Sequence, residues 1–251
     1  MIPIKSKEDI EGMRRSCRAV AKIRDKLAAM VAPGITTGEI DRYAASLIKD
    51  IGGTSAFLNY RGFPGNICIS LNEEVVHGIG SERKLIYGDV VKLDVGIVLD
   101  GWVGDTAISV GVGAVSPEVE RLMRRTEESL YLGIAKALNG RRLGDISSAI
   151  ENHVVSGGYS VVRDFVGHGV GRRLHEEPQI PNYGKAATGP KLKTGMTLAI
   201  EPMVNLGRNA VKILKDGWTV VTVDAKPSAH YEHTILITEN EPEILTQGGK
   251  E

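Results

Sequence analysis

Two segments with helical periodicity open the chain. Residues 6–31 start with Ser and Asp three residues apart, the spacing of a capping box, and then carry apolar residues on one helical face. A Pro-Gly pair follows and predicts the end of that helix. Residues 36–51 repeat the pattern, with Thr and Glu as the capping pair and Gly-Gly after the last apolar position. We therefore expect two amphipathic helices before any long strand.

Residues 90–110 predict a β-hairpin, because β-branched apolar residues flank a central Asp-Gly pair. With that pair in the turn, Asp94 lies opposite Ala107 and Gly96 lies opposite Asp105. The two aspartates are then diagonal neighbours on one face of the hairpin, roughly 7–8 Å apart. Unpaired carboxylates among apolar residues are costly, and a bound cation would remove that cost.

The same order of elements then recurs. Helical patterns return at 116–139 and 145–155, and strands are predicted at 67–71, 160–166, 196–204, 217–223 and 231–238. We interpret residues 1–251 as one domain with an internal repeat, about 5–112 and 115–240. Helices followed by strands, rather than alternating with them, indicate an α+β fold with a mainly antiparallel sheet and helices on one face.

Short motifs support the repeat. His-Gly-Ile-Gly at 77–80 resembles His-Gly-Val-Gly at 168–171, and an Asp-Gly-Trp triplet occurs in each half. A glycine lies six residues before both Asp94 and Glu201. If the halves pack symmetrically, carboxylates at equivalent strand positions converge.

The expected cluster is rich in oxygen ligands. It comprises two aspartates, two glutamates and one imidazole: Asp94, Asp105, Glu201, Glu232 and His168. Such a set, without thiolates, suits Mn, Fe, Co or Zn. Four carboxylates exceed what one ion needs, so we expect a pair of bridged ions and a hydrolytic reaction.

The six histidines differ in context. Three lie in glycine-rich or loop segments, where the backbone can approach a ligand, and are the candidates for the site: His77, His168 and His175. Structural or surface positions are expected for His153, His230 and His233.

Composition narrows the function classes. The 251 residues carry 31 basic and 31 acidic side chains without a long basic run, which argues against binding to nucleic acid or anionic membranes. Two cysteines give no disulfide framework, and no apolar segment has the length of a membrane span. We expect a cytoplasmic protein that is neither secreted nor membrane-bound.

Several segments together resemble one enzyme family. They are G-H-G-V-G-R-R-L-H-E-E-P from Gly167, I-E-P from Ile200, Y-E-H-T from Tyr231, L-D-V-G and G-D-T around Asp94 and Asp105, and C-I-S-L-N-E-E-V-V-H-G-I from Cys68. In these motifs, and over essentially its whole length, the chain is similar to the type I methionine aminopeptidases. The resemblance implies the pita-bread fold, in which two pseudo-symmetric halves form a curved sheet with helices on its outer face.

The resemblance also assigns metal ligands. It implies two divalent ions (Co, Mn, Fe or Zn), one bound by Asp94, the other by His168 and Glu201, with Asp105 and Glu232 bridging them. A water or hydroxide between the ions would attack the scissile carbonyl.

Further roles follow from the same resemblance. Glu201 would move the proton of that water to the leaving amine, His77 would contact the peptide nitrogen, and His175 would donate to the carbonyl oxygen. A pocket for the methionine side chain would include Tyr60, Phe63, Cys68 and Trp218. Leu174 and Phe63 depart from the residues expected there, Phe and Tyr, and bear on selectivity.

The implied function is removal of the initiator methionine from nascent chains at the ribosome when the second residue is small, by a monomeric enzyme. Two alternatives stay open. An Xaa-Pro peptidase of this fold usually has an additional N-terminal domain, whereas this chain begins with its first repeat helix. A non-catalytic adaptor would have lost metal ligands, and all five are present.

Overall fold

The predicted hairpin is the centre of the computed structural model, which describes residues 2–248. Its strands are β4, Val90–Leu99, and β5, Trp102–Gly111. Asp94 pairs with Ala107 and Gly96 with Asp105, as the Asp-Gly turn predicted.

The hairpin belongs to a larger antiparallel sheet. The other strands of the described chain, which are divided among three sheets, are β1 Thr54–Ser55, β2 Cys68–Leu71, β3 Glu74–Val76, β6 Ser160–Val161, β7 Gly167–Gly169, β8 Glu176–Ile180, β9 Thr197–Ile200, β10 Met203–Asn205, β11 Val211–Ile213, β12 Val220–Thr222, β13 Ser228–His230, β14 Glu232–Leu236 and β15 Glu243–Ile244. Within residues 2–248, nine strands form the main sheet in the order β1-β4-β5-β14-β9-β7-β8, with β2 also on β4 and β15 on β14. Two three-stranded sheets, β13-β10-β6 and β11-β12-β3, adjoin it. The expected α+β architecture is confirmed.

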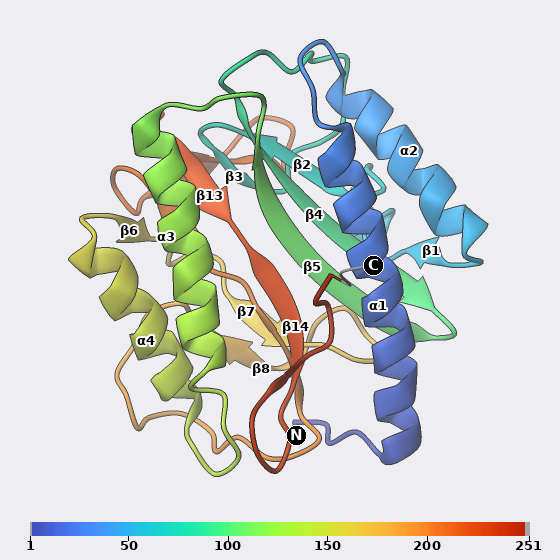
Figure 1. Cartoon of the computed structure of the whole chain (residues 1–251), viewed down its shortest axis with the longest axis vertical. Coiled ribbons are helices and arrows are strands. Elements are labelled where there is room, and N and C mark those ends of the chain that lie inside the picture. The colour runs from blue at the N-terminus through green and yellow to red at the C-terminus, as the bar shows by residue number, and fades with distance from the viewer. Residues whose placement is uncertain (1, 249–251) are drawn as a thin grey trace.

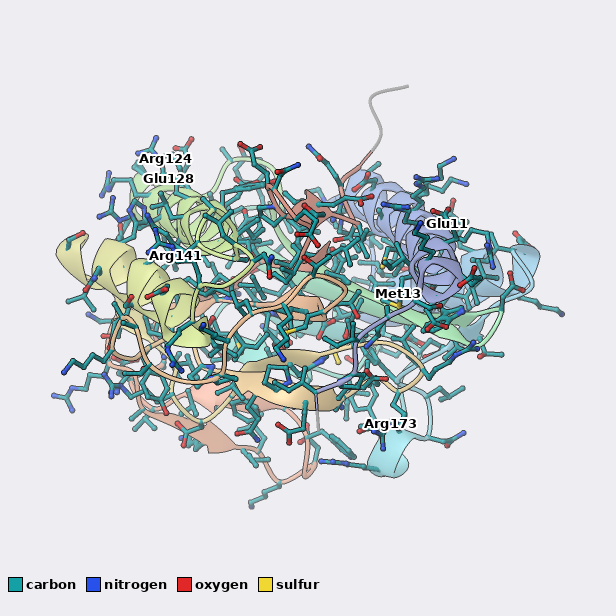
Figure 2. The ribbon with its side chains drawn as sticks, turned by 90° about the horizontal axis from the view of Figure 1, so that it is seen from below. Glu11, Met13, Arg124, Glu128, Arg141 and Arg173 are labelled. Carbon is teal, nitrogen blue, oxygen red and sulfur yellow. The ribbon has the colours of Figure 1, made fainter. Side chains whose placement is uncertain are left out.

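Four α-helices of the described chain cover one face of this sheet (Figure 1): α1 Lys7–Met30, α2 Thr37–Asp50, α3 Pro117–Ile134 and α4 Leu143–Ser156. Both predicted capping boxes are present, at the starts of α1 and α2. Figure 2 shows the helices as one layer, with Met13 of α1 facing the sheet and Glu11 facing away from it. Each helix pair lies over its own half of the sheet (Figure 1). In the part of the chain described, no helix is both long and apolar enough to cross a bilayer.

Several predicted elements differ in extent from the expectation, among them the strand predicted at 217–223, which is limited to β12, Val220–Thr222. Helix α3 ends at Ile134 rather than at 139, because the backbone of residues 140–141 pairs with Leu192. The strand predicted at 196–204 divides into β9 and β10, which belong to different sheets, since the intervening Pro202 has no N–H to donate. The strand predicted at 160–166 is limited to β6.

Close packing between α1 and β5 leads to a prediction. A Cβ atom at Gly12 would lie 2.1 Å from Nε1 of Trp102, a buried residue whose ring is covered by the Arg172 guanidinium. Gly12→Ala is therefore expected to lower the free energy of unfolding by about 1–3 kcal/mol through overpacking, although alanine is the better helix former. Urea denaturation measures this, with Glu11→Ala on the exposed face as control. Equal midpoints for Gly12→Ala and the control would contradict the packing argument.

Candidate functional site

Strand register brings the predicted ligands together. Asp94 on β4 lies opposite Ala107 on β5, and Glu232 on β14 lies on the other side of the same alanine. Two strands further, His168 on β7 lies opposite Ala199 on β9. Strands β4, β14 and β7 therefore present these three side chains to one region of the sheet.

The remaining two carboxylates complete this cluster. Asp105 is on β5, and Glu201 directly follows β9. Nε2 of His168 lies 3.4 Å from Oε1 of Glu201 and 3.7 Å from Oδ2 of Asp105. One ligand atom each from Asp105, His168 and Glu232 lie within 4.8 Å of one another, and these residues are only 3%, 7% and 2% exposed.

Burial and mutual repulsion make this cluster electrostatically unfavourable by itself. Burial raises the pKa of Asp94 to about 7. It also raises the pKa values of the other three carboxyls, Asp105, Glu201 and Glu232, and their carboxylate neighbours raise them further. One buried oxygen each of Asp94, Asp105 and Glu232 has no hydrogen-bond partner among the described residues.

The donor set fits divalent metal ions. Nδ1 of His168 lies 3.0 Å from the carbonyl of Gly169, to which it donates, so the lone pair of Nε2 is directed at the carboxylates. Burial, with His175 nearby, lowers the pKa of His168 to about 3, which keeps the ring neutral. Carboxylates without partners beside one neutral imidazole are the ligands that Mn, Fe, Co and Zn accept.

The cluster lies in a cavity of about 350 Å³. All eleven residues predicted for the site line it: Tyr60, Phe63, Cys68, His77, Asp94, Asp105, His168, His175, Glu201, Trp218 and Glu232. Leu174, noted as a departure, also lines it.

The walls of the cavity are largely aromatic. Phe63 and Trp218 pack edge-to-face with ring centroids 5.2 Å apart, and His77 lies edge-on to Phe165 at 5.4 Å. The hydroxyl of Tyr60 lies 2.8 Å from Nδ1 of His175. An apolar wall beside a polar cluster is typical of a site that binds one organic side chain next to a reacting group.

Sequence reasoning missed other lining residues: Phe57, Arg61, Val76, Asp164, Phe165, Val166, Gln179 and Met203. The ring of Phe57 occupies the space that a Cβ at Gly96 would fill, a contact between distant residues that the sequence did not indicate. For Gln179 the sequence contained little signal, because its place on β8 depends on pairing with β7.

The three histidines expected to be structural differ in their surroundings. His153 bonds Glu128 on the helical face, and His233 contacts Thr246 and Tyr131. His230 is buried, neither of its ring nitrogens has a hydrogen-bond partner within residues 2–248, and its Nε2 lies 3.8 Å from Oε2 of Glu201. His230 therefore contacts the cluster, which its sequence context did not indicate.

The raised carboxyl pKa values predict that metal binding depends on pH. A carboxyl with a pKa of about 7, such as Asp94, is mostly protonated at pH 6 and mostly ionised at pH 8. Because a divalent ion must displace that proton, the Kd for Mn²⁺ is expected to fall by about 10-fold from pH 6 to pH 8 for each such carboxyl. Titration calorimetry at both pH values measures it. The same Kd at pH 6 and pH 8 would show that the ligands are already ionised in the metal-free protein.

Comparison with known proteins finds metallopeptidases that match almost the whole chain. The pattern of metallopeptidase family M24 matches residues 11–239. A methionine aminopeptidase of Clostridium perfringens is 50% identical over 246 residues, which are 98% of this chain and 99% of that protein. Methionine aminopeptidase 1 of Bacillus subtilis is also 50% identical, over 98% of this chain and its own full length. The solved methionine aminopeptidase of Rickettsia prowazekii superposes with a TM-score of 0.97 at 41% identity, over 98% of this chain and 100% of that one.

Proposed function

Since the chain belongs to metallopeptidase family M24, we propose that it removes the initiator methionine from new polypeptides whose second residue is small. It is a metal-dependent aminopeptidase of the methionine aminopeptidase type, and its curved antiparallel sheet with helices on one face is the pita-bread fold. The observation that carries the proposal is the strand register, which gathers two aspartates, two glutamates and one histidine at one cavity.

The number of ions and the role of each ligand are part of the proposal. Asp94 would bind one divalent ion, His168 and Glu201 the other, and Asp105 and Glu232 would be shared. The buried carboxylate oxygens without partners support this assignment, and Co, Mn, Fe or Zn would suit the ligands. Such ions, when bound, lower the pKa of water and polarise a carbonyl oxygen.

The chain's own residues then carry the proton transfers. Glu201, at 14% side-chain exposure, accepts a proton from the attacking water and passes it to the leaving amine. His175 donates a hydrogen bond to the scissile carbonyl oxygen and stabilises the developing oxyanion. His77, which burial keeps neutral by lowering its pKa to about 4, contacts the peptide nitrogen.

The methionine side chain would occupy the aromatic part of the cavity. This part offers aromatic rings and sulfur, which suit an unbranched thioether. The side chains are those of Tyr60, Phe63, Cys68 and Trp218. Leu174, 7% exposed, closes this wall with an aliphatic side chain, and it and Phe63 set the width available to the substrate.

The physiological setting completes the proposal. The substrates would be nascent chains at the ribosome, and the enzyme would act in the cytoplasm as a monomer with one catalytic domain built from the two repeats. The methionine aminopeptidases similar to this chain support N-terminal peptide substrates, and the ribosomal, cytoplasmic and monomeric setting is part of the proposal.

A peptide panel tests the proposed specificity. The protein is stripped with chelator, reloaded with Mn, Co, Fe or Zn singly, and offered Met-Ala-Ser, Met-Ile-Ser and Ala-Pro-Ala. Release of methionine from Met-Ala-Ser alone is the expected result. Cleavage of Ala-Pro-Ala would instead indicate an Xaa-Pro peptidase, and no cleavage with any ion would indicate an adaptor.

A further inference from the structure

Two imidazoles stand side by side in the cavity, yet the proposed function needs them in opposite protonation patterns. The ring centroids of His168 and His175 are 4.3 Å apart. A metal ligand needs a lone pair on Nε2, whereas a donor to a carbonyl needs a proton there. A neutral histidine carries only one ring proton, and the partner of Nδ1 decides which nitrogen holds it.

The hydrogen-bond partner of His168 determines its tautomer. A backbone carbonyl can only accept a hydrogen bond, so Gly169 requires the proton of His168 on Nδ1. Nε2 then keeps its lone pair. The partner of His175 is different, because Nδ1 lies 2.8 Å from the phenol oxygen of Tyr60, and a phenol can donate or accept.

The surroundings of Tyr60 favour donation. The Arg61 guanidinium carbon lies 5.4 Å from the centroid of the Tyr60 ring. A cation over the ring withdraws electron density from the phenol, which strengthens its O–H as a donor and weakens its oxygen as an acceptor. The Nδ1 of a neutral His175 ring, 2.8 Å from the phenol oxygen, is placed to accept that hydrogen bond.

The backbone holds Tyr60 at this position. The N–H of Tyr60 donates to the carbonyl of Phe57, and its own carbonyl accepts from Phe63. Asn59 and Arg61, on either side of it, have left-handed φ values of 65° and 52°. Such strain in residues other than glycine persists only where the surrounding structure imposes it, and it concentrates at functional sites. This turn is the short cyan coil on the side of the sheet away from the helices (Figure 2).

We infer that Tyr60 is a positioning residue, whose hydroxyl donates a hydrogen bond to Nδ1 of His175. This bond fixes the ring proton on Nε2, and the Nε2–H then donates a hydrogen bond to the scissile carbonyl oxygen. This inference rests on the proposed role of His175. The cavity then holds adjacent histidines in opposite tautomers: Gly169 makes His168 a ligand, and Tyr60 makes His175 a donor.

The direct test is ¹⁵N NMR of the metal-free protein labelled at histidine, at pH 8, with His175→Gln to assign the signals. The expected spectrum has His175 protonated at Nε2 and unprotonated at Nδ1, and the Nδ1 signal shifts in Tyr60→Phe. A protonated Nδ1 in the unsubstituted protein would overturn the inference. This measurement needs no turnover, so it decides the tautomer even if the proposed function fails.

Kinetics give the second test. Tyr60→Phe keeps the aromatic wall and removes only the hydroxyl, so kcat for Met-Ala-Ser is expected to fall about 10- to 100-fold, as for other outer partners of functional imidazoles. KM is expected to change little, because the donated bond matters most in the transition state. Tyr131→Phe is the matched control, since it removes a phenol hydroxyl bonded to His233 outside the cavity. A raised KM with unchanged kcat in Tyr60→Phe would show that the side chain only contacts substrate.

Discussion

Replacing Glu201 by glutamine is expected to lower kcat for Met-Ala-Ser by about 10³-fold, within the range that general acid–base groups contribute. The amide has the same size as the carboxyl but cannot take a proton from water. Nε2 of His168 and Nε2 of His230 lie 3.4 and 3.8 Å from the two Glu201 oxygens, so the variant side chain has room to keep its orientation. Methionine release under saturating metal measures the effect.

Metal content must be determined on the same samples, because Glu201 is also a proposed ligand. Glu120→Gln, an exposed position on α3, is the control and should turn over normally. If a fully metal-loaded Glu201→Gln protein kept more than a tenth of kcat, Glu201 would not be the group that transfers the proton.

Asp94→Asn is expected to have opposite effects on activity and on metal-free stability. Loss of a ligand should lower kcat by at least about 10²-fold, because Lewis-acid stabilisation by a metal amounts to several kcal/mol. Burial raises the folded-state pKa of Asp94 to about 7, above the unfolded value near 4. The stability associated with this carboxyl is thus present below about pH 4 and is lost as the pH rises through about 7.

In chelator at pH 8, where Asp94 is ionised, the neutral asparagine should therefore raise Tm above that of the unsubstituted protein. The difference should shrink at pH 5.5, where Asp94 is protonated in the fold. Asp100→Asn in the exposed turn of the same hairpin is the control; its carboxylate lies 3.6 Å from Arg15. Full turnover by Asp94→Asn after stripping and reloading would remove Asp94 from the metal site.

The hairpin was predictable in detail because its turn is local. An Asp-Gly pair fixes the register of the strands on either side, and here Asp100 and Gly101 have φ values of 51° and 75°. The positions of Asp94 and Asp105 relative to each other therefore follow from neighbouring residues alone. Both capping boxes are equally local signals, and both helices begin where these signals indicated.

Tertiary contacts explain the elements that were predicted incorrectly or not predicted. The α3 pattern continues to residue 138, but pairing of residues 140–141 with Leu192 ends the helix early. Strand β8 carries Glu and Pro, a poor strand pattern, and forms because β7 pairs with it. Leu192 lies far from α3 in sequence, whereas β7 is the element directly before β8.

In the site, too, local motifs were predictable and contacts between distant residues were not. Motifs and resemblance predict eleven residues for it, and all of them line the cavity. The contacts that orient them were not identified, because Tyr60 and His175 are 115 residues apart and meet only in the folded chain. The contact of His230 with Glu201 is of the same kind, since His230 ends β13 and Glu201 directly follows β9.

Metal titration with parallel assay tests the central claim most directly. Mn²⁺ is added stepwise to the stripped protein, and bound ion and methionine release from Met-Ala-Ser are measured on the same samples. The proposed site predicts no release without metal, activity that rises with bound ion, and two ions at saturation. Full release of methionine by the protein in excess chelator, with no ion bound, would contradict a metal-dependent reaction at this cavity.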